Sequence, residues 1–248
     1  RTVHRFTPGR GDATLDVPQQ VGAAKPRSRA GLVLHLTDGI ALFEANGEQR
    51  TWLVYWAREG YGAGATTVDS KGRLWATTMR QDGHGAGWLT MITGDGRAQT
   101  VLDDVVACHG LAFSPDDLRL YLVDSPSNTI DVCDIDADSG RLTHRRPLCE
   151  IDDSPGQPAG LCVDADGALW VALRGGSEVR RYTPDGVLDR SLPLPVQAPT
   201  GCCFGGSDLQ DLYITSAREG LTQQGELDGS LLVVPGAGTG IRSPSFAG

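Results

Sequence analysis

The sequence has no long apolar run and no clustered positive charge. None of its apolar runs approaches the roughly 20 residues that a membrane-spanning helix needs, and its first residues do not resemble a secretion signal. The chain carries 31 acidic and 22 basic residues, a formal net charge of −9. Nucleic acids and anionic membranes attract clustered Lys and Arg, so we expect neither as a partner. We expect a cytoplasmic protein whose partner is a small-molecule substrate, and the sequence indicates no oligomeric state.

The six cysteines include no Cys-x-x-Cys pair, which excludes a zinc ribbon and a thioredoxin-like motif. Cys162, Cys202 and Cys203 lie in apolar strand-like runs, where cysteine behaves as a small core residue. We expect the cysteines to be reduced and buried. A disulfide framework is the weaker interpretation, because a core of this size does not need covalent support.

Helical periodicity is also absent, since no segment shows the sustained apolar period of an ordinary helix. Instead, one pattern recurs every 41 to 50 residues: a short apolar run ending in Asp, Ser or Gly, then Leu-Trp or Leu-Tyr inside a second apolar run. Such repeats, built from short strands around Asp-Gly turns, are typical of a β-propeller. Because each inner strand of a propeller starts at the mouth of the central channel, the first residues of the repeats are candidates for a site. They are Gly64, His109, Ala159 and Thr200.

Weaker copies extend the pattern toward the N-terminus. Residues 19–52 look like a fifth repeat, residues 2–17 match only the outer half of another, and residues 230–234 complete the last clear one. We therefore predict an all-β fold with one domain over residues 1–248, a six-bladed β-propeller in which the opening inner strands of one blade are missing. Because a blade without inner strands exposes sheet edges, we expect the parent protein to begin with a further short segment.

Glycines and aromatic residues recur at fixed places of the repeat. We expect four glycines to permit close backbone approach near the crowded axis, and three aromatic side chains to lie in the core. The glycines are Gly22, Gly110, Gly160 and Gly201, and the aromatic residues are Trp75, Trp170 and Tyr213.

Four strings are specific enough to suggest a family: residues 72–79 (GRLWATTM), 158–164 (PAGLCVD), 201–206 (GCCFGG) and 213–220 (YITSAREG). They closely resemble the regucalcin family, which includes senescence marker protein, gluconolactonase and luciferin-regenerating enzyme, and the likeness covers nearly the whole chain. The resemblance implies a six-bladed propeller with one divalent metal, usually calcium, in the channel. In that family the metal polarises a lactone carbonyl and activates water.

The resemblance also implies ligands and substrate contacts, and here the chain departs from the family pattern. The glutamate ligand of the family falls in the N-terminal strand that this sequence lacks. The substrate-contacting arginine corresponds to Gly62 and the first asparagine to Gly64. The second asparagine corresponds to His109. The aspartate, both ligand and general base, corresponds to Ala159.

The internal repeat gives the same register and adds Thr200 as its fourth member. Together these positions supply one imidazole, one hydroxyl and no carboxylate, whereas calcium takes six or more oxygen ligands. We therefore expect no calcium site and no cofactor. If a metal is retained, we expect a divalent cation (Ca, Zn or Mg) with His109 as a ligand. The loss of side chains at Gly64 and Ala159 also predicts a wider mouth and a substrate bulkier than a sugar lactone.

Two side chains are candidates for catalysis. His109 is placed to act as a general acid or base, because imidazole titrates near neutrality; the alternative is a histidine that lines the pocket passively. Alternation along a strand predicts that the preceding Cys108 points to the opposite face. Asp82, which matches a substrate-contacting acid of the family, lies with His84 in a Gly-rich loop. This loop either covers the channel or, more simply, is solvated.

The expected substrate contacts are Gly62, Gly64, Ala159, Thr200 and Asp124, of which Asp124 follows an apolar strand and alternatively caps the next turn. Three hypotheses for the function follow. The first is a divergent enzyme that opens or rearranges a lactone-like ring by acid–base chemistry at His109, without calcium. The second is an ordinary divalent-metal-dependent lactonase. The third is a non-catalytic propeller that binds a small molecule.

Overall fold

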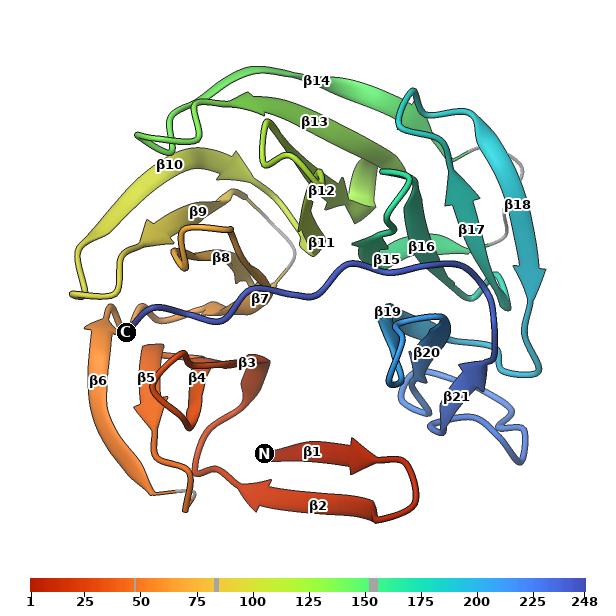
Figure 1. The fold of residues 1–248 in the computed structure, drawn as a ribbon, viewed down its shortest axis with the longest axis horizontal. Helices are drawn as coiled ribbons and strands as arrows, with labels where there is room; N and C mark the ends of the chain where they lie inside the picture. Colours follow the sequence, from red (N-terminus) through yellow and green to blue (C-terminus); the bar gives the residue numbers. More distant parts are fainter. Residues whose placement is uncertain (47, 83–84, 152–155) are drawn as a thin grey trace. The chain divides into compact units, whose positions relative to one another are not determined.

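The structure, a computed structural model, describes residues 1–46, 48–82, 85–151 and 156–248. These residues form 21 β-strands and one short 3-10 helix, and the strands make six antiparallel sheets (Figure 1). The chain comprises two compact units. The first contains residues 1–107 and 243–248, and the second contains residues 108–242.

The first unit contains three of the sheets. Strands β1 (Thr2–Thr7) and β2 (Gly11–Asp16) form a two-stranded sheet. The next sheet contains, in order, β3 (Val21–Pro26), β4 (Leu32–Leu36), β5 (Gly39–Phe43) and β6 (Gln49–Tyr55). The third contains β7 (Tyr61–Val68), β8 (Leu74–Arg80), β9 (Gly87–Ile92) and β10 (Ala98–Val105).

The second unit contains the other three sheets. One contains β11 (Cys108–Phe113), β12 (Arg119–Asp124), β13 (Thr129–Ile135) and β14 (Leu142–Glu150), with the 3-10 helix η1 (Ser125–Ser127) between β12 and β13. The next contains β15 (Gln157–Val163), β16 (Leu169–Arg174), β17 (Glu178–Tyr182) and β18 (Leu188–Pro193). The last has three strands, β19 (Pro199–Gly205), β20 (Asp211–Ser216) and β21 (Leu231–Val234).

Each of the larger sheets is a meander in which strands pair in sequence order, as in a propeller blade. The repeats that begin at Gly64, His109, Ala159 and Thr200 each supply the first two strands of one sheet, as predicted. The two-stranded sheet β1–β2 is the half repeat expected at residues 2–17. Within the described residues, these sheets are consistent with a six-bladed propeller in which one blade is incomplete.

A buried aspartate at the end of the inner strand explains the recurring turn and the aromatic residue that follows it. Oδ1 of Asp164 accepts hydrogen bonds from the backbone N–H groups of Asp166 and Ala168 at 3.0 and 2.9 Å. Its Oδ2 accepts one from the Trp170 indole N–H at 2.9 Å. Asp69 does the same in the first unit, where the indole of Trp75 donates to it at 2.9 Å. The aspartate therefore fixes the turn and orients the core aromatic, because a buried indole N–H needs an acceptor.

Trp75 and Trp170 are fully buried, as predicted, while Tyr213 is half-buried. Three of the four predicted glycines lie where neighbouring inner strands approach closely. A Cβ on Gly110 would lie 2.7 Å from the Ala159 carbonyl oxygen, and one on Gly160 would lie 2.8 Å from the Cα of Gly201. A Cβ on Gly22 would meet the Cβ of Ala63 at 2.5 Å. Gly201 differs, because its nearest such contact is 3.5 Å.

All six cysteines are free thiols, as expected. The expectation that they are buried holds for Cys108 and Cys133 only, because Cys149, Cys162 and Cys202 are half-buried and Cys203 is exposed. Side chains alternate along a strand, so Cys202 faces inward, where its Sγ lies 3.2 Å from the Trp170 carbonyl oxygen, and Cys203 faces solvent. Within the ranges that the structure describes, no helix is long and apolar enough to cross a membrane.

Candidate active site at the starts of three inner strands

In the second unit, the inner strands β11, β15 and β19 lie side by side (Figure 1). The close approaches of Gly110 to Ala159 and of Gly160 to Thr200 and Gly201 fix their register. Each glycine directly follows a predicted site residue. The structure therefore brings His109, Ala159 and Thr200 together at one edge of three neighbouring sheets.

His109 is exposed, whereas Cys108 is buried and directs its Sγ toward the Gly110 carbonyl oxygen at 3.1 Å. The two side chains thus point to opposite faces, as predicted. Desolvation lowers the pKa of His109 below its usual value, and the guanidinium of Arg174 lowers it further. The carboxylate of Asp124 opposes these two effects. The lowered pKa favours the neutral imidazole, in which one ring nitrogen keeps a free lone pair.

Asp124 ends β12, next to the start of β11, where it is the register partner of Cys108. It stands at the N-cap position of η1 but makes no side-chain capping bond. Its Oδ1 is buried without a hydrogen-bond partner among the described residues, and its Oδ2 lies 3.7 Å from Nη2 of Arg145. The carboxylate is thus placed to act on the electrostatics of His109 rather than to cap the turn.

Arg174 is a residue of this site that the sequence did not single out. It ends β16 and pairs in register with Gln157, the first residue of β15. A second strand of a blade ends at the edge where the first strand begins, so Arg174 lies at the edge that carries Ala159. The signal was available in the sequence: a lone arginine directly after the apolar run 169–173 and before Gly175-Gly176.

The donors at these three strand starts do not fit the hard divalent cation that the resemblance implies. Ala159 offers no side-chain donor, and the Thr200 hydroxyl is 2.9 Å from that of Thr215. His109 supplies a nitrogen, whereas calcium takes six or more oxygen ligands. Over residues 1–46, 48–82, 85–151 and 156–248, no group of three or more His, Cys, Asp or Glu side chains is placed to hold a metal ion.

The predicted contacts Gly62 and Gly64 belong to β7 of the first unit and are both buried. A Cβ on Gly64 would lie 2.5 Å from Oγ1 of Thr77 and 3.0 Å from Cγ of Met79. A Cβ on Gly62 would lie 3.0 Å from Nε2 of Gln81. The expectation that Gly64 leaves extra room is therefore wrong, because side chains of β8 and of the residue after it already fill the space beside these glycines.

Asp82 follows β8 in the first unit and is exposed. Nε of Arg80 donates to its Oδ1 at 2.9 Å, and Nη2 of Arg80 pairs with its Oδ2. The ion pair holds the carboxylate beside its own strand, and the catalytic role of Asp82 stays a prediction. His84 lies outside the described residues.

A second histidine, His35 of β4, is buried and plays a structural part in the first unit. Its Nδ1 lies 3.0 Å from Oγ1 of Thr66, and its ring packs edge-on against Trp56 with centroids 5.7 Å apart. Its Nε2 has no hydrogen-bond partner among the residues described. Burial lowers the pKa of His35 to about 3, so the ring is neutral.

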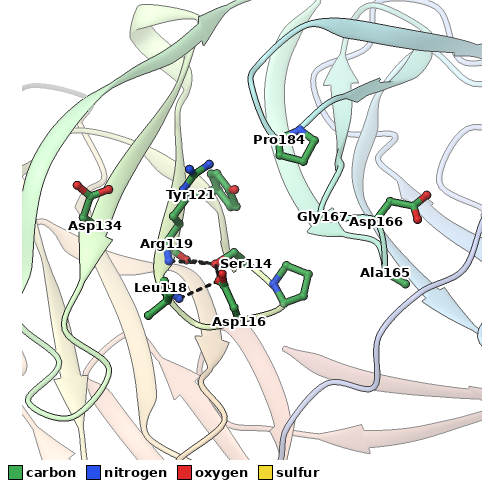
Figure 2. Close-up of a pocket in the computed structure, with 11 residues that line it drawn as sticks. Ser114, Asp116, Leu118, Arg119, Tyr121, Asp134, Ala165, Asp166, Gly167 and Pro184 are labelled. Carbon is green, nitrogen blue, oxygen red and sulfur yellow. Dashed lines mark hydrogen bonds between the residues drawn. The ribbon is translucent and has the colours of Figure 1, made fainter.

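A pocket of about 570 Å³ lies elsewhere in the second unit (Figure 2). The turns that follow β11 and β15 line it, so it lies at the ends of these strands that are remote from His109 and Ala159. Its carboxylates are already engaged: Asp116 accepts from Ser114 Oγ at 2.6 Å, and Asp134 accepts from Arg146 at 2.9 Å. This pocket therefore offers no reactive side chain comparable to His109.

Comparison with known proteins gives the family of this chain. The model of the SMP-30/gluconolactonase/LRE-like region matches residues 1–218. The chain belongs to this family. It is 35% identical to the 6-deoxy-6-sulfogluconolactonase of Pseudomonas putida, over 99% of this chain and 87% of that protein. It is 34% identical to the regucalcin of Sus scrofa, over 73% of this chain and 64% of that protein. The match thus spans less than two thirds of the regucalcin.

Solved structures of this family confirm the propeller fold. A luciferin-regenerating enzyme superposes with a TM-score of 0.92 at 25% identity, covering 99% of this chain and 88% of that chain. Regucalcin from Agrobacterium tumefaciens also gives a TM-score of 0.92, at 24% identity, covering 99% of this chain and 86% of that chain. The predicted family and the all-β propeller are therefore both confirmed.

Proposed function

We propose that this protein hydrolyses a small cyclic ester, with His109 as the general base, and that the reaction needs no hard cation held at Ala159 and Thr200. The observation that carries the proposal is an exposed histidine at the start of an inner strand, in a chain of this family. Desolvation and the charge of Arg174 lower its pKa, which favours the neutral imidazole that a general base needs. Membership of a family with a named lactonase supports the reaction type.

The chemistry follows from the neutral imidazole. Its free nitrogen takes a proton from water while the water oxygen forms a bond to the lactone carbonyl carbon. The tetrahedral intermediate collapses by breaking the bond between that carbon and the ring oxygen, and the imidazolium returns its proton to the departing oxygen. Asp124 stabilises the transient imidazolium, since its carboxylate favours the charged form of His109. The product is an open-chain hydroxy acid.

The test is hydrolysis of glucono-1,5-lactone, followed with a pH indicator, by wild type and by His109→Ala. We expect kcat to fall about 100-fold or more, the usual contribution of general base catalysis. His144→Ala is a matched control, because His144 is a surface histidine of the same unit with 77% of its side chain exposed. It should leave kcat unchanged.

The same experiment separates the alternatives. Full activity in His109→Ala would refute the role of His109. Binding of the lactone without turnover by the wild type would favour a non-catalytic propeller. A metal-dependent lactonase instead requires about one bound divalent ion per chain in elemental analysis, and activity that disappears on chelation.

A further inference from the structure

We propose that Arg174 binds an anionic group of the substrate, a carboxylate, sulfonate or phosphate carried outside the lactone ring. This inference rests on the proposed function and deepens it, because it assigns a substrate class to the same site. Arg174 would be a specificity-determining residue that leaves the proton transfers to His109.

The position of Arg174 places its charge at the site. Leu173 pairs with Pro158 and Arg174 with Gln157, so the last residue of β16 lies level with the first residue of β15. Ala159 follows two residues later on β15, and its carbonyl oxygen faces Gly110, the neighbour of His109. Arg174 therefore belongs to the same edge as His109, with β15 between the two strands that carry them.

A backbone carbonyl oxygen holds the guanidinium in place. Its Nη2 donates a hydrogen bond to the Glu219 carbonyl oxygen at 3.0 Å, and a Cβ on Gly220 would lie 3.4 Å from the same nitrogen. Among the described residues, no carboxylate forms an ion pair with Arg174. Arg181 of the neighbouring strand differs, since Asp164, Asp166 and Asp189 all bind it. Arg174 is exposed, and within the described ranges no carboxylate compensates its charge.

The surroundings favour an anion over a neutral polar group. The charge of Arg174 reaches His109, where it lowers the pKa of the imidazole. Asp124, whose carboxylate opposes this effect at His109, lies 3.7 Å from Arg145. Arg presents planar N–H groups that match the oxygens of carboxylate, sulfonate and phosphate, and such charged hydrogen bonds are stronger than neutral ones.

The experiment compares two lactones that differ by one anionic group, glucono-1,5-lactone and its 6-phosphate, with 6-deoxy-6-sulfogluconolactone as a second anionic probe. We expect Arg174→Ala to lower kcat/KM for both anionic lactones by about 10- to 100-fold, mainly through KM, the range expected for a lost charged hydrogen bond. The neutral lactone should change by less than about two-fold. Arg174→Lys should restore part of the loss. Arg97→Ala, at a side chain that is 87% exposed in the first unit, is the control and should change neither.

Three results would overturn the inference, two in the kinetic comparison and one in a binding measurement. An equal loss for neutral and anionic lactones would mean that Arg174 acts on the reacting carbonyl or on folding, and no loss would mean that it does not contact substrate. Calorimetric binding of 1,5-anhydroglucitol 6-phosphate, compared with unphosphorylated 1,5-anhydroglucitol, repeats the test without turnover. If wild type hydrolyses no lactone, the proposed function fails, but weaker binding of the phosphate by Arg174→Ala alone would still support an anion site. Equal binding of the two probes by wild type would refute it.

Discussion

Asp164 accepts hydrogen bonds from four groups. Its side chain is only 2% exposed, so water cannot take its place as the acceptor. Replacing it with Asn keeps the size of the side chain and lets Oδ1 go on accepting from the N–H groups of Asp166 and Ala168. The new amide N–H₂ group then faces the indole N–H of Trp170 and the guanidinium of Arg181. Two donors that bonded to a carboxylate oxygen at 2.9 and 2.8 Å would meet a donor instead.

The expected cost is the sum of these two losses. A buried donor left without its acceptor costs about 1–3 kcal/mol, which applies to the Trp170 indole. The hydrogen bond from Arg181 involves two charges and contributes about 1.5–3 kcal/mol. Arg181 keeps Asp189 at 2.6 Å, which limits the second loss. We therefore expect Asp164→Asn to lower the free energy of unfolding by about 3–5 kcal/mol, a large part of the roughly 5–15 kcal/mol typical of a folded domain.

Urea unfolding followed by tryptophan fluorescence measures the change, and a fall in the midpoint with an unchanged slope would show that the native state has lost stability. Asp166→Asn is the control. Asp166 bonds to the same arginine at 3.1 Å but is 85% exposed, so its removal should cost less than about 1 kcal/mol. If the two variants unfold at the same urea concentration, the buried aspartate does not organise the turn and the aromatic residue as inferred.

Two further predictions concern pH. Burial and Arg174 lower the pKa of His109. The rate of lactone hydrolysis should therefore be at its maximum at neutral pH and fall only as the pH drops through that lowered pKa. In Arg174→Ala the fall in rate at low pH should begin at a higher pH than in wild type. If the pH–rate profiles of the two proteins fall at the same pH, Arg174 does not lower the pKa of His109 as inferred. His35 should make the protein sensitive to acid: its pKa is about 3 when folded and near 6.5 when unfolded, so the unfolded state binds the proton first. Stability is then lost as pH falls below 6.5, by about 2 kcal/mol between pH 7 and 5. Urea unfolding at pH 7 and pH 5 should show no such loss of stability in His35→Asn. If wild type and His35→Asn lose the same stability between the two pH values, the predicted role of His35 is refuted.

The repeat predicted the fold well because its spacing is a local property of the chain. The turn and aromatic pattern around Asp69-Trp75 and Asp164-Trp170 fixes two strands at a time, and it gave the starts of β11, β15 and β19 directly. The alternation of Cys108 and His109 followed from the same rule of strand geometry. These features depend on neighbours in sequence, so one sequence was enough to find them.

The surroundings of the site were harder to predict, because they depend on contacts between strands. The space at Gly64 is filled by Thr77 and Met79, and β7 has an irregular register between Ala63 and Thr66 that no repeat alignment revealed. Arg174 escaped notice because the repeat drew attention to where strands begin, while Arg174 lies where one ends. Cys203 was expected in the core because its run is apolar, although alternation places it outside.

The close packing at Gly110 and Gly160 also limits how enzymes on this scaffold can change. At these two positions any added methyl group would collide with backbone of the adjoining strand, so substitutions there would push neighbouring inner strands apart. Of the residues immediately before them, His109 is exposed, whereas Ala159 is buried. A mutagenesis library that randomises the two exposed residues His109 and Arg174 would therefore sample new reactivities while sparing the architecture.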